Sequence, residues 1–315
     1  MSTPPDLSFR ALTQTNQRIK IVDIGANPID GSPPYAGLLR AGHAEVIGFE
    51  PNPEALARLQ ASSGPHETYL AHAIGDGGRH ILHICAAPGM TSLLLPNEKV
   101  LALFHGFSEW GRVLATETMD TLRLDDVPEA EGVELLKLDI QGAELMALRH
   151  AETRLASTLV IQAEVEFLPM YVGQPLFAEV EAYLRQRGFM FHRFYPQTSR
   201  VVRPLLVDNN IYAELSQLVW ADGVFIRDLT RLEHLSDIAL LRMAMILHDC
   251  YGSVDVVLHL LTEHDRRTGA ILATAYLKGM RQEPAVPPIR PARVKRVASG
   301  TRTRRGSGGD RCVLT

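Results

Sequence analysis

Short apolar runs alternate with helical patterns through the first two hundred residues, and this alternation limits the possible folds more than any other feature of the sequence. The expected strands are residues 20–24, 45–49, 68–73, 135–139, 159–166 and 189–195. The expected helices are residues 35–41, 53–61, 143–155 and 176–187. Because the first four strands are almost continuously apolar, both of their faces should be covered. The pattern predicts an α/β fold with a doubly wound, Rossmann-like sheet.

Residues 79–123 interrupt the alternation. One further strand is expected at 80–85, followed by a long loop rich in proline and glycine. A loop of that length inside a compact domain usually forms a lid or a binding site. After the sixth strand, residues 217–227 have the apolar character of a closing strand.

These patterns predict four consecutive regions. They are an N-terminal extension (1–17), an α/β domain (18–230), a helical region (231–282) and a basic tail (283–315). The aliphatic stripe of the helical region is typical either of an appendage packed on the sheet or of a homodimerisation element. The tail is rich in Pro, Arg, Ser and Gly, a composition typical of disorder.

Charge is unevenly distributed. Residues 284–315 contain eight Lys or Arg against one acid, a net +7, which leaves −11 for the first 283 residues of a chain whose total is −4. An acidic folded part argues against nucleic acid as a partner. No apolar run reaches the ~18 residues of a membrane span. The beginning of the chain does not look like a signal peptide, and three widely spaced cysteines suit a reducing cytoplasm.

The first motif is a hydrophobic strand that runs into a glycine turn, residues 21–27 (IVDIGAN). Gly25 at the end of a first parallel strand permits a tight turn and the close approach of a ligand. Twenty-three residues later, the second strand ends in residues 48–53 (GFEPNP). A carboxylate at that position, here Glu50, can accept hydrogen bonds from both hydroxyls of a ribose. Together the two motifs predict a nucleoside-containing cofactor.

The turn itself distinguishes between cofactors. A dinucleotide site reads G-x-G-x-x-G, so that pyrophosphate rests on a helix N-terminus. Here Asn27 occupies the second glycine position, and Asp30 lies where phosphate would bind. A cofactor without phosphate, such as S-adenosylmethionine, fits this turn better than NAD does. The cationic groups of that cofactor also suit the neighbouring Asp23 and Asp139.

A third motif, residues 135–144 (LLKLDIQGAE), places Asp139 at the end of the fourth strand. Ligands of such sheets bind at the carboxyl ends of the strands, so Asp139 should face the same crevice as Asp23 and Glu50. A weaker marker, residues 118–122 (TMDTL), leads out of the long loop.

In the order and spacing of these motifs, the chain resembles the FkbM family of S-adenosylmethionine-dependent methyltransferases over roughly residues 20–195. The resemblance implies a sheet of the class I methyltransferase type, so that residues 18–230 become a methyltransferase domain with a C-terminal helical appendage. It implies that Glu50 holds the ribose and that Asp139 faces the methyl group and the acceptor. The other implied cofactor contacts are Asp23, Gly25, Ala26 and Asn27 at the methionine end, Pro51 beside the ribose, and Ala73, Ile74 and Asp76 around the adenine. Two departures stand out: Gln141 replaces the usual Glu, and residues 28–34 replace a glycine and a helix start.

Methyl transfer to a hydroxyl needs in-line placement and an acceptor whose proton can leave. Asp139 is the first candidate for the base, and Glu164 on the next strand is the second, with Glu166 behind it. The remaining options are His80, His83, His105 and His192. Oxygen ligands for a metal could come from the same acids, but the reading without a metal is favoured. Thr91 and Ser92 are interpreted as a loop cap that could touch the acceptor.

The sequence therefore predicts an S-adenosylmethionine-dependent O-methyltransferase acting on a hydroxyl of a sugar, glycan precursor or secondary metabolite. The substrate class comes from the resemblance alone. Two alternatives stay open. One is a nicotinamide-dependent oxidoreductase on the same sheet, and the other is a non-catalytic binding protein with a methyltransferase fold.

Overall fold

The computed structural model describes residues 9–13, 17–27, 31–280 and 313–314. Of the basic tail, only Val313–Leu314 (β12) is described, paired in parallel with Leu206–Val207 (β10). The rest of the predicted disordered tail, and residues 28–30 of the glycine turn, lie outside the described residues.

A seven-stranded sheet forms the centre of the molecule, in the order β3-β2-β1-β7-β8-β11-β9. All of its neighbouring strands pair in parallel except β11, which is antiparallel to both β8 and β9. Its strands are Ile19–Ile24 (β1), Ala44–Phe49 (β2), Glu67–Leu70 (β3), Leu135–Leu138 (β7), Val160–Glu166 (β8), Phe189–Arg200 (β9) and Gln217–Arg227 (β11). Numbered within the sheet, this is the 3-2-1-4-5-7-6 order of class I methyltransferases, so the predicted fold class is confirmed.

The prediction of one strand at residues 68–73 is wrong, because the structure has two short strands in this region. β3 pairs with β2 only as far as the partners Phe49 and Leu70, where β2 ends. Beyond that point an edge strand has no partner in the main sheet. The chain instead forms Ala73–Ile74 (β4), which pairs with a strand of a second sheet.

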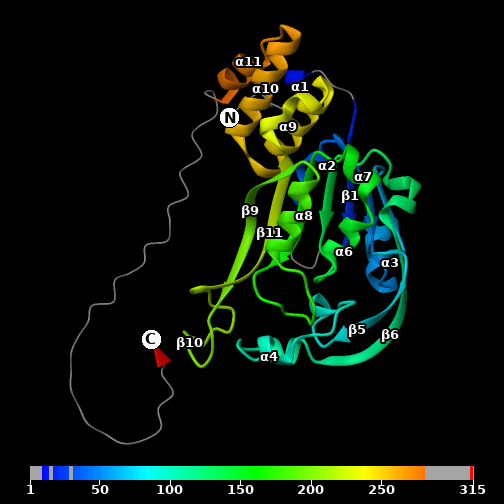
Figure 1. Cartoon of the computed structure of the whole chain (residues 1–315), viewed down its shortest axis with the longest axis vertical. Coiled ribbons are helices and arrows are strands. Elements are labelled where there is room, and N and C mark those ends of the chain that lie inside the picture. Colours follow the sequence, from blue (N-terminus) through cyan, green and yellow to red (C-terminus); the bar gives the residue numbers. More distant parts are fainter. Residues whose placement is uncertain (1–8, 14–16, 28–30, 281–312, 315) are drawn as a thin grey trace, which may run out of the picture.

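The predicted long loop after residue 85 is also wrong in part. It contains the strand Val113–Leu122 (β6), which pairs with β4 and with Arg79–Cys85 (β5) to form a three-stranded sheet. β6 is exposed along most of its length, so it lacks the alternation of apolar and polar residues that marks a half-buried strand. Two short helices, Glu98–Leu101 (α4) and Phe107–Trp110 (α5), lie between β5 and β6. Figure 1 shows this part of the chain at the opposite end of the molecule from the C-terminal helices.

The predicted helix 143–155 is divided into Glu144–Arg149 (α6) and Glu152–Ser157 (α7). The backbone leaves helical geometry between them, and the Asp125 carboxylate accepts hydrogen bonds from the amides of Thr153 and Arg154, both at 3.0 Å. This cap satisfies amides at the start of α7 and so favours a new helix there. The other helices that surround the sheet are Ala36–Arg40 (α2), Pro53–Ser62 (α3) and Phe177–Gln186 (α8).

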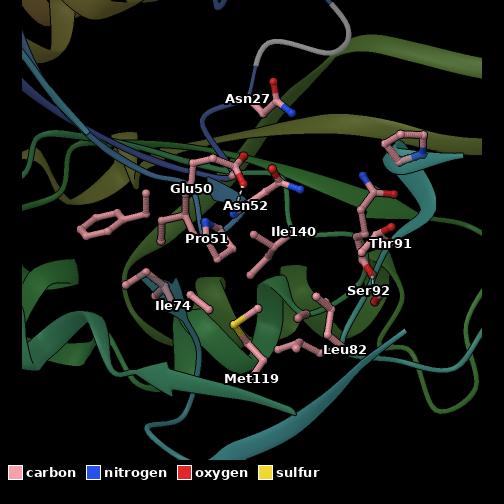
Figure 2. Close-up of a pocket in the computed structure, with 18 of the residues that line it drawn as sticks. Asn27, Glu50, Pro51, Asn52, Ile74, Leu82, Thr91, Ser92, Met119 and Ile140 are labelled. Carbon is pink, nitrogen blue, oxygen red and sulfur yellow. Dashed lines mark hydrogen bonds between the residues drawn. The ribbon is translucent and has the colours of Figure 1, made fainter. Parts of the chain in front are cut away.

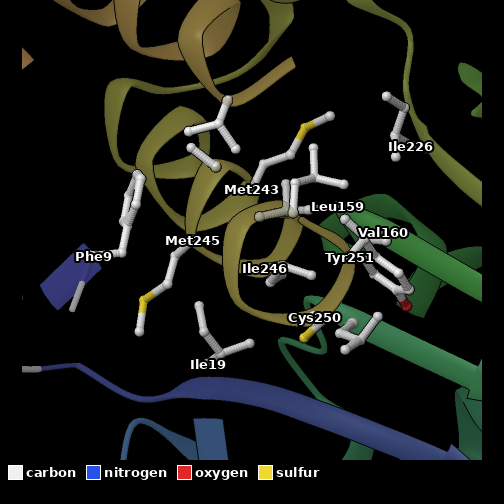
Figure 3. Close-up of a cluster of buried hydrophobic side chains, with 14 of the residues drawn as sticks. Phe9, Ile19, Leu159, Val160, Ile226, Met243, Met245, Ile246, Cys250 and Tyr251 are labelled. Atoms are coloured by element: carbon white, nitrogen blue, oxygen red, sulfur yellow. The ribbon is translucent and has the colours of Figure 1, made fainter. Parts of the chain in front are cut away.

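The C-terminal helices share a hydrophobic core with one face of the sheet. They are Asp237–Tyr251 (α9), Val254–Thr268 (α10) and Leu272–Met280 (α11). Met243 and Ile246 of α9 are fully buried in one cluster with Ile19 of β1 and Val160 of β8, as Figure 3 shows. Phe9, in the short helix Phe9–Thr13 (α1), belongs to the same cluster. Of the two readings of the helical region, packing on the sheet is the one found within this chain.

An ion pair also anchors α9 to the sheet. The Arg242 guanidinium donates to both carboxylate oxygens of Glu134, just before β7, and Glu134 also accepts from the amide of Lys20 at 3.0 Å. No helix in the described part of the chain combines the length and the apolar character needed to cross a bilayer.

Candidate active site

Two cavities open at the carboxyl ends of the central strands. The first, of about 700 Å³, lies over the ends of β1, β2, β4 and β7. The second, of about 710 Å³, lies beside the first and is bounded by β1, β7, β8, the β9–β11 pair and the loop before α2. Asn27 and Asp139 line both. The two chambers therefore meet at the ends of β1 and β7.

The wall of the first cavity nearest the sheet is polar. Glu50 follows the last residue of β2 and is only 7% exposed, and one of its carboxylate oxygens accepts from the amide of Asn52 at 2.8 Å. Burial raises the pKa of Glu50, and the backbone amides of Asn52 and Asn27 partly oppose this effect. Figure 2 shows Glu50, Asn52 and Asn27 on the same side of the cavity. A carboxylate that lines a cavity at the end of a strand can accept hydrogen bonds from two neighbouring hydroxyls of a ligand.

The opposite wall is apolar. It is made by Ile74 of β4, Leu82 and Ile84 of β5 and Met119 of β6, and Ile140 projects between the two walls (Figure 2). The three-stranded sheet, whose strand β6 was expected to be loop, therefore encloses the cavity. An apolar slot that faces a carboxylate matches a flat heteroaromatic base joined to a sugar.

Gly25 is required by the backbone at this point. Its φ is +80°, and a Cβ there would lie 2.0 Å from the carbonyl oxygen of Asp139. The ends of β1 and β7 touch at Gly25, and its amide also donates to the carbonyl of Phe49 at 3.0 Å. The glycine thus brings three strand ends together, a role beyond the ligand approach expected from the sequence.

Asp23 lies on the other face of β1, toward the second cavity. One of its carboxylate oxygens accepts from the hydroxyl of Tyr35 at 2.5 Å, and the other accepts from Nζ of Lys137 at 3.2 Å. Burial raises the pKa of Asp23, opposed first by the charge of Lys137. Burial lowers the pKa of Lys137, but the charges of Asp23 and Asp139 outweigh that effect, so its pKa is raised. Asp23 therefore forms a buried pair with Lys137 and does not line the first cavity.

Asp139 is held from two sides. Its Oδ1 accepts from Nε2 of Gln141 at 2.9 Å, and its Oδ2 lies 3.9 Å from Nζ of Lys137. The same Gln141 nitrogen donates to Oε2 of Glu164 at 3.0 Å. Burial raises the pKa of Glu164 well above its usual value, and the charges of Asp139 and Glu166 add to the effect. Burial and the neighbouring acids therefore favour the neutral form of Glu164.

The turn after β7 is fixed by backbone and side-chain bonds. The amides of Ile140 and Gly142 donate to Oε1 of Glu144 at 2.8 and 3.2 Å. Burial raises the pKa of Glu144 to about 7, although these amides favour its charged form. The Ser92 hydroxyl donates to the carbonyl of Gln141 at 2.7 Å and accepts from the amide of Leu94. Glu144 and Ser92 therefore hold the loops, although Ser92 and its neighbour Thr91 also line the first cavity.

The second cavity has acids at the sheet and cationic and aromatic groups farther out. Asp222 of β11 accepts from Nε2 of Gln162 at 2.5 Å, and the hydroxyl of Tyr251 in α9 donates to Oε1 of Gln162 at 2.8 Å. The guanidinium of Arg200 lies 5.0 Å from the centre of the Trp220 ring. Gln162, Arg200, Trp220 and Asp222 line the chamber, and Tyr251 is hydrogen-bonded to one of them.

The predicted site residues divide among these places. Gly25, Asn27, Glu50, Pro51, Ala73, Ile74 and Asp139 line the first cavity, whereas Asp23, Ala26 and Glu164 line the second. Asp76 lines neither, because its Oδ1 is taken by Nε2 of His80 at 2.7 Å, the amide of Gly78 and the hydroxyl of Thr121. These contacts, led by the one from His80, lower the pKa of Asp76 to about 2. Its predicted position beside the adenine is therefore not supported.

The four candidate histidines also lie away from both cavities in the described part of the chain. His80 pairs with Asp76, His105 bonds the carbonyl of Leu205, and His192 bonds the hydroxyl of Ser253. His83 lies on β5, where its backbone bridges to Ser92. Within the described ranges, no three histidine, cysteine, aspartate or glutamate side chains gather in an arrangement that could hold a metal ion.

Sequence analysis missed Lys137, Tyr171 and most of the second cavity. One signal was available for Lys137: it lies two residues before Asp139 in a strand, so the two side chains share a face. Its parallel partner in the register is Asp23. The polar residues Gln162 and Glu164 follow the same alternation on β8.

The sequence was compared with protein families and with known proteins. A family model, the methyltransferase FkbM domain, matches residues 23–191. A 2-O-methyltransferase, NoeI of Sinorhizobium fredii (strain NBRC 101917 / NGR234), is 32% identical over 162 residues, which cover 49% of this chain and 66% of the relative. The match thus spans slightly less than two thirds of that relative.

Solved structures are more distant. A putative methyltransferase from Thermoplasma acidophilum is 8% identical with a TM-score of 0.36, and the match covers 67% of this chain and 69% of that one. The precorrin-6y C5,15-methyltransferase of Geobacter metallireducens GS-15 is 15% identical with a TM-score of 0.35, over 70% and 85% of the two chains. These scores are low, and the family follows from the matched domain alone.

Proposed function

This chain belongs to the FkbM family of methyltransferases, and from that premise we propose that it transfers a methyl group from S-adenosylmethionine to a hydroxyl of a sugar, glycan precursor or secondary metabolite. The observation that carries the proposal is the meeting of two cavities at Asp139 and Asn27. One chamber would hold the cofactor, the other the acceptor, and the methyl group would pass between them.

The chemistry of the first cavity fits the cofactor. S-adenosylmethionine supplies a methyl group already activated on a cationic sulfonium. Glu50 would accept hydrogen bonds from the ribose hydroxyls, with Pro51 beside it, and the adenine would lie against Ala73 and Ile74 and the apolar wall from β5 and β6. Gly25 and Asn27 would border the methionine end. Asp23, with both oxygens engaged by Tyr35 and Lys137, would act through the local charge and not by direct contact.

Asp139 is the proposed base. The acceptor oxygen would form a bond to the methyl carbon while the carbon–sulfur bond breaks, and the hydroxyl proton would pass to the Asp139 carboxylate. A base at this position contributes roughly 10²- to 10⁴-fold to the rate, and in-line placement contributes several further kcal/mol. Glu164, with its raised pKa, would hold its proton and orient the acceptor.

The second cavity supports an acceptor rich in hydroxyls. Its lining includes the acids Asp139 and Asp222, which can accept hydrogen bonds, the buried Glu164, and Trp220, which offers a flat apolar surface. The relative NoeI, by its name a 2-O-methyltransferase, supports oxygen as the methylated atom. The family membership weighs against the nicotinamide alternative, because a methyltransferase transfers no hydride.

A turnover assay tests this proposal. The full chain is incubated with S-adenosylmethionine and a panel of sugars, nucleotide sugars and hydroxylated metabolites, and release of S-adenosylhomocysteine is measured. We expect release that depends on one class of acceptor, and we expect Asp139→Asn to lower kcat by roughly 10²- to 10⁴-fold. Asp120→Asn removes an acid whose side chain is 69% exposed, on β6, and should leave kcat unchanged.

Two results would contradict parts of the proposal. Tight cofactor binding without turnover on any acceptor in the panel would favour the non-catalytic alternative. Full activity of Asp139→Asn would remove Asp139 as the base while leaving the cofactor assignment intact.

A further inference from the structure

At the junction between the two cavities, an amide side chain donates hydrogen bonds to two acids, one just after β7 and one on β8. Gln141 follows β7 and lines the first cavity, and its amide nitrogen reaches Asp139, shared by both cavities, and Glu164, in the wall of the second. We propose that Gln141 is a positioning residue, whose amide fixes the Asp139 carboxylate between the two chambers. This inference rests on the proposed function, because Asp139 is its proposed base.

The hydrogen-bond pattern determines the orientation of the amide. A carboxylate can only accept hydrogen bonds, so Asp139 as the proposed base requires a donor, and the Gln141 amide nitrogen carries two hydrogens, one for Asp139 and one for Glu164. The amide oxygen accepts from the hydroxyl of Tyr171 at 3.3 Å. Tyr171 is fully buried, and its hydroxyl also lies 3.3 Å from the carbonyl of Met90. A flipped amide would place its oxygen against Asp139 and its nitrogen against the tyrosine, so the neighbours favour the observed orientation.

The backbone at Gln141 is held in an uncommon conformation. Its φ is +55°, in the left-handed region, which residues with a side chain rarely adopt. Gly142 follows with a φ of +96°. The bond from Ser92 to the carbonyl of Gln141 and those from the amides of Ile140 and Gly142 to Glu144 maintain this turn. Such outliers persist where the surroundings fix them, and here they aim the side chain at two acids.

The consequence is a carboxylate with its two oxygens held separately. Gln141 binds Oδ1 of Asp139, while Oδ2 lies toward Lys137. A carboxylate at the same position would place a third acceptor between Asp139 and Glu164. Like charges at hydrogen-bonding distance favour protonation, so the group of acids would hold an additional proton near neutral pH.

The test uses the charge difference between two ligands, so it needs no acceptor. S-adenosylmethionine carries a sulfonium charge, whereas S-adenosylhomocysteine does not, and the ratio of their affinities reports the charge of the acids at the junction. The affinities of both ligands for the full chain are measured by calorimetry between about pH 6 and about pH 8. The ionisable groups packed around this junction are Asp23, Lys137, Asp139, Glu144, Glu164, Glu166, Tyr171 and Asp222. The pKa values of Lys137 and Tyr171 are raised and lie above this range.

We expect Gln141→Glu to make the preference for S-adenosylmethionine rise more steeply with pH than in the wild type. The acids release the extra proton across this range and become more negative, which favours the cationic ligand. For one proton, the ratio of the two affinities should rise by up to about tenfold per pH unit. Tyr171→Phe keeps the buried ring but removes the hydroxyl that holds the Gln141 amide. It should change the pH dependence of the affinity ratio in the same direction as Gln141→Glu, but by less. Gln60→Glu adds the same charge on the exposed side of α3 and should leave the slope as in the wild type.

The outcomes separate the two claims. Slopes for Gln141→Glu and Tyr171→Phe that match the wild type, with both ligands bound, would overturn the positioning role and leave the proposed function in place. A wild-type protein that binds neither ligand would overturn the proposed function, and the positioning role with it.

Discussion

Gly25 carries a backbone requirement that no other residue type meets. Its φ is positive, and a Cβ would collide with the carbonyl oxygen of Asp139, a backbone atom that cannot rotate away. The same residue therefore sets the spacing between β1 and β7 and keeps the edge of the first cavity open. Stability and site geometry depend on it together.

We expect Gly25→Ala to lower the free energy of unfolding by about 2–4 kcal/mol, of which about 1–2 kcal/mol comes from the positive φ. Gly132→Ala is the matched control, because Gly132 has a φ of +73° but nothing within 4 Å of its would-be Cβ. Urea unfolding of both variants measures the difference. If Gly25→Ala costs no more than Gly132→Ala, the close approach of the two strand ends is wrong.

At the scale of elements, the turn from β7 into α6 holds a buried acid whose charge opposes folding. The pKa of Glu144 is raised to about 7 by burial, well above the value of an exposed glutamate. The folded state therefore binds the proton more tightly than the unfolded state does. The stability that protonated Glu144 contributes is fully present below the pKa of a glutamate in the unfolded chain, about 4.3. It is lost as the pH rises through the folded-state pKa of about 7.

Glu144→Gln should flatten this dependence. The amide oxygen can still accept from the amides of Ile140 and Gly142, while the titration is removed. We expect the loss of unfolding free energy between about pH 5 and about pH 8 to shrink by roughly 1–3 kcal/mol, with the remainder coming from Glu164 and Glu166. The exposed Glu129→Gln serves as control. An unchanged slope in Glu144→Gln would show that this acid is ionised in the folded protein throughout the range.

Strands differ in how well the sequence predicts them, according to how much of each strand is buried. The strands with both faces covered are nearly continuous apolar runs, and β1, β2 and β7 lie within one residue of the predicted boundaries. β6 is exposed for most of its length, and no apolar alternation marked it. The division between β3 and β4 depends on where β2 ends, which is a property of the partner strand and not of residues 67–74.

In the site too, some features follow from the local sequence and others depend on partners elsewhere in the fold. Gly25, Glu50 and Asp139 could be predicted because strand ends in such a sheet meet at one edge. The separation of Asp23 from the first cavity could not be predicted, because it follows from the register that sets Asp23 opposite Lys137. The bridge from Gln141 to Asp139 and Glu164 depends on the φ of one turn residue. The bond of Asp76 to His80 depends on the turn that leads from β4 into β5.

For the whole molecule, the fold places two chambers side by side at the edge of one sheet. The C-terminal helices fill one face of the sheet and contribute Asp249 and Cys250 to the second chamber, so they belong to the same core. The three-stranded sheet contributes residues of all three of its strands to the lining of the first chamber. We propose that the first chamber is a nucleoside site and the second an acceptor site, with a shared wall at Asp139.

Calorimetric titration with S-adenosylhomocysteine tests whether the first chamber is a nucleoside site. We expect the full chain to bind this ligand and Glu50→Ala to bind it at least tenfold more weakly, a loss of about 1.4 kcal/mol. Glu45→Ala, at the opposite end of β2, should bind as the wild type does. Absence of binding up to roughly millimolar ligand, or equal affinity in Glu50→Ala and the wild type, would contradict this assignment.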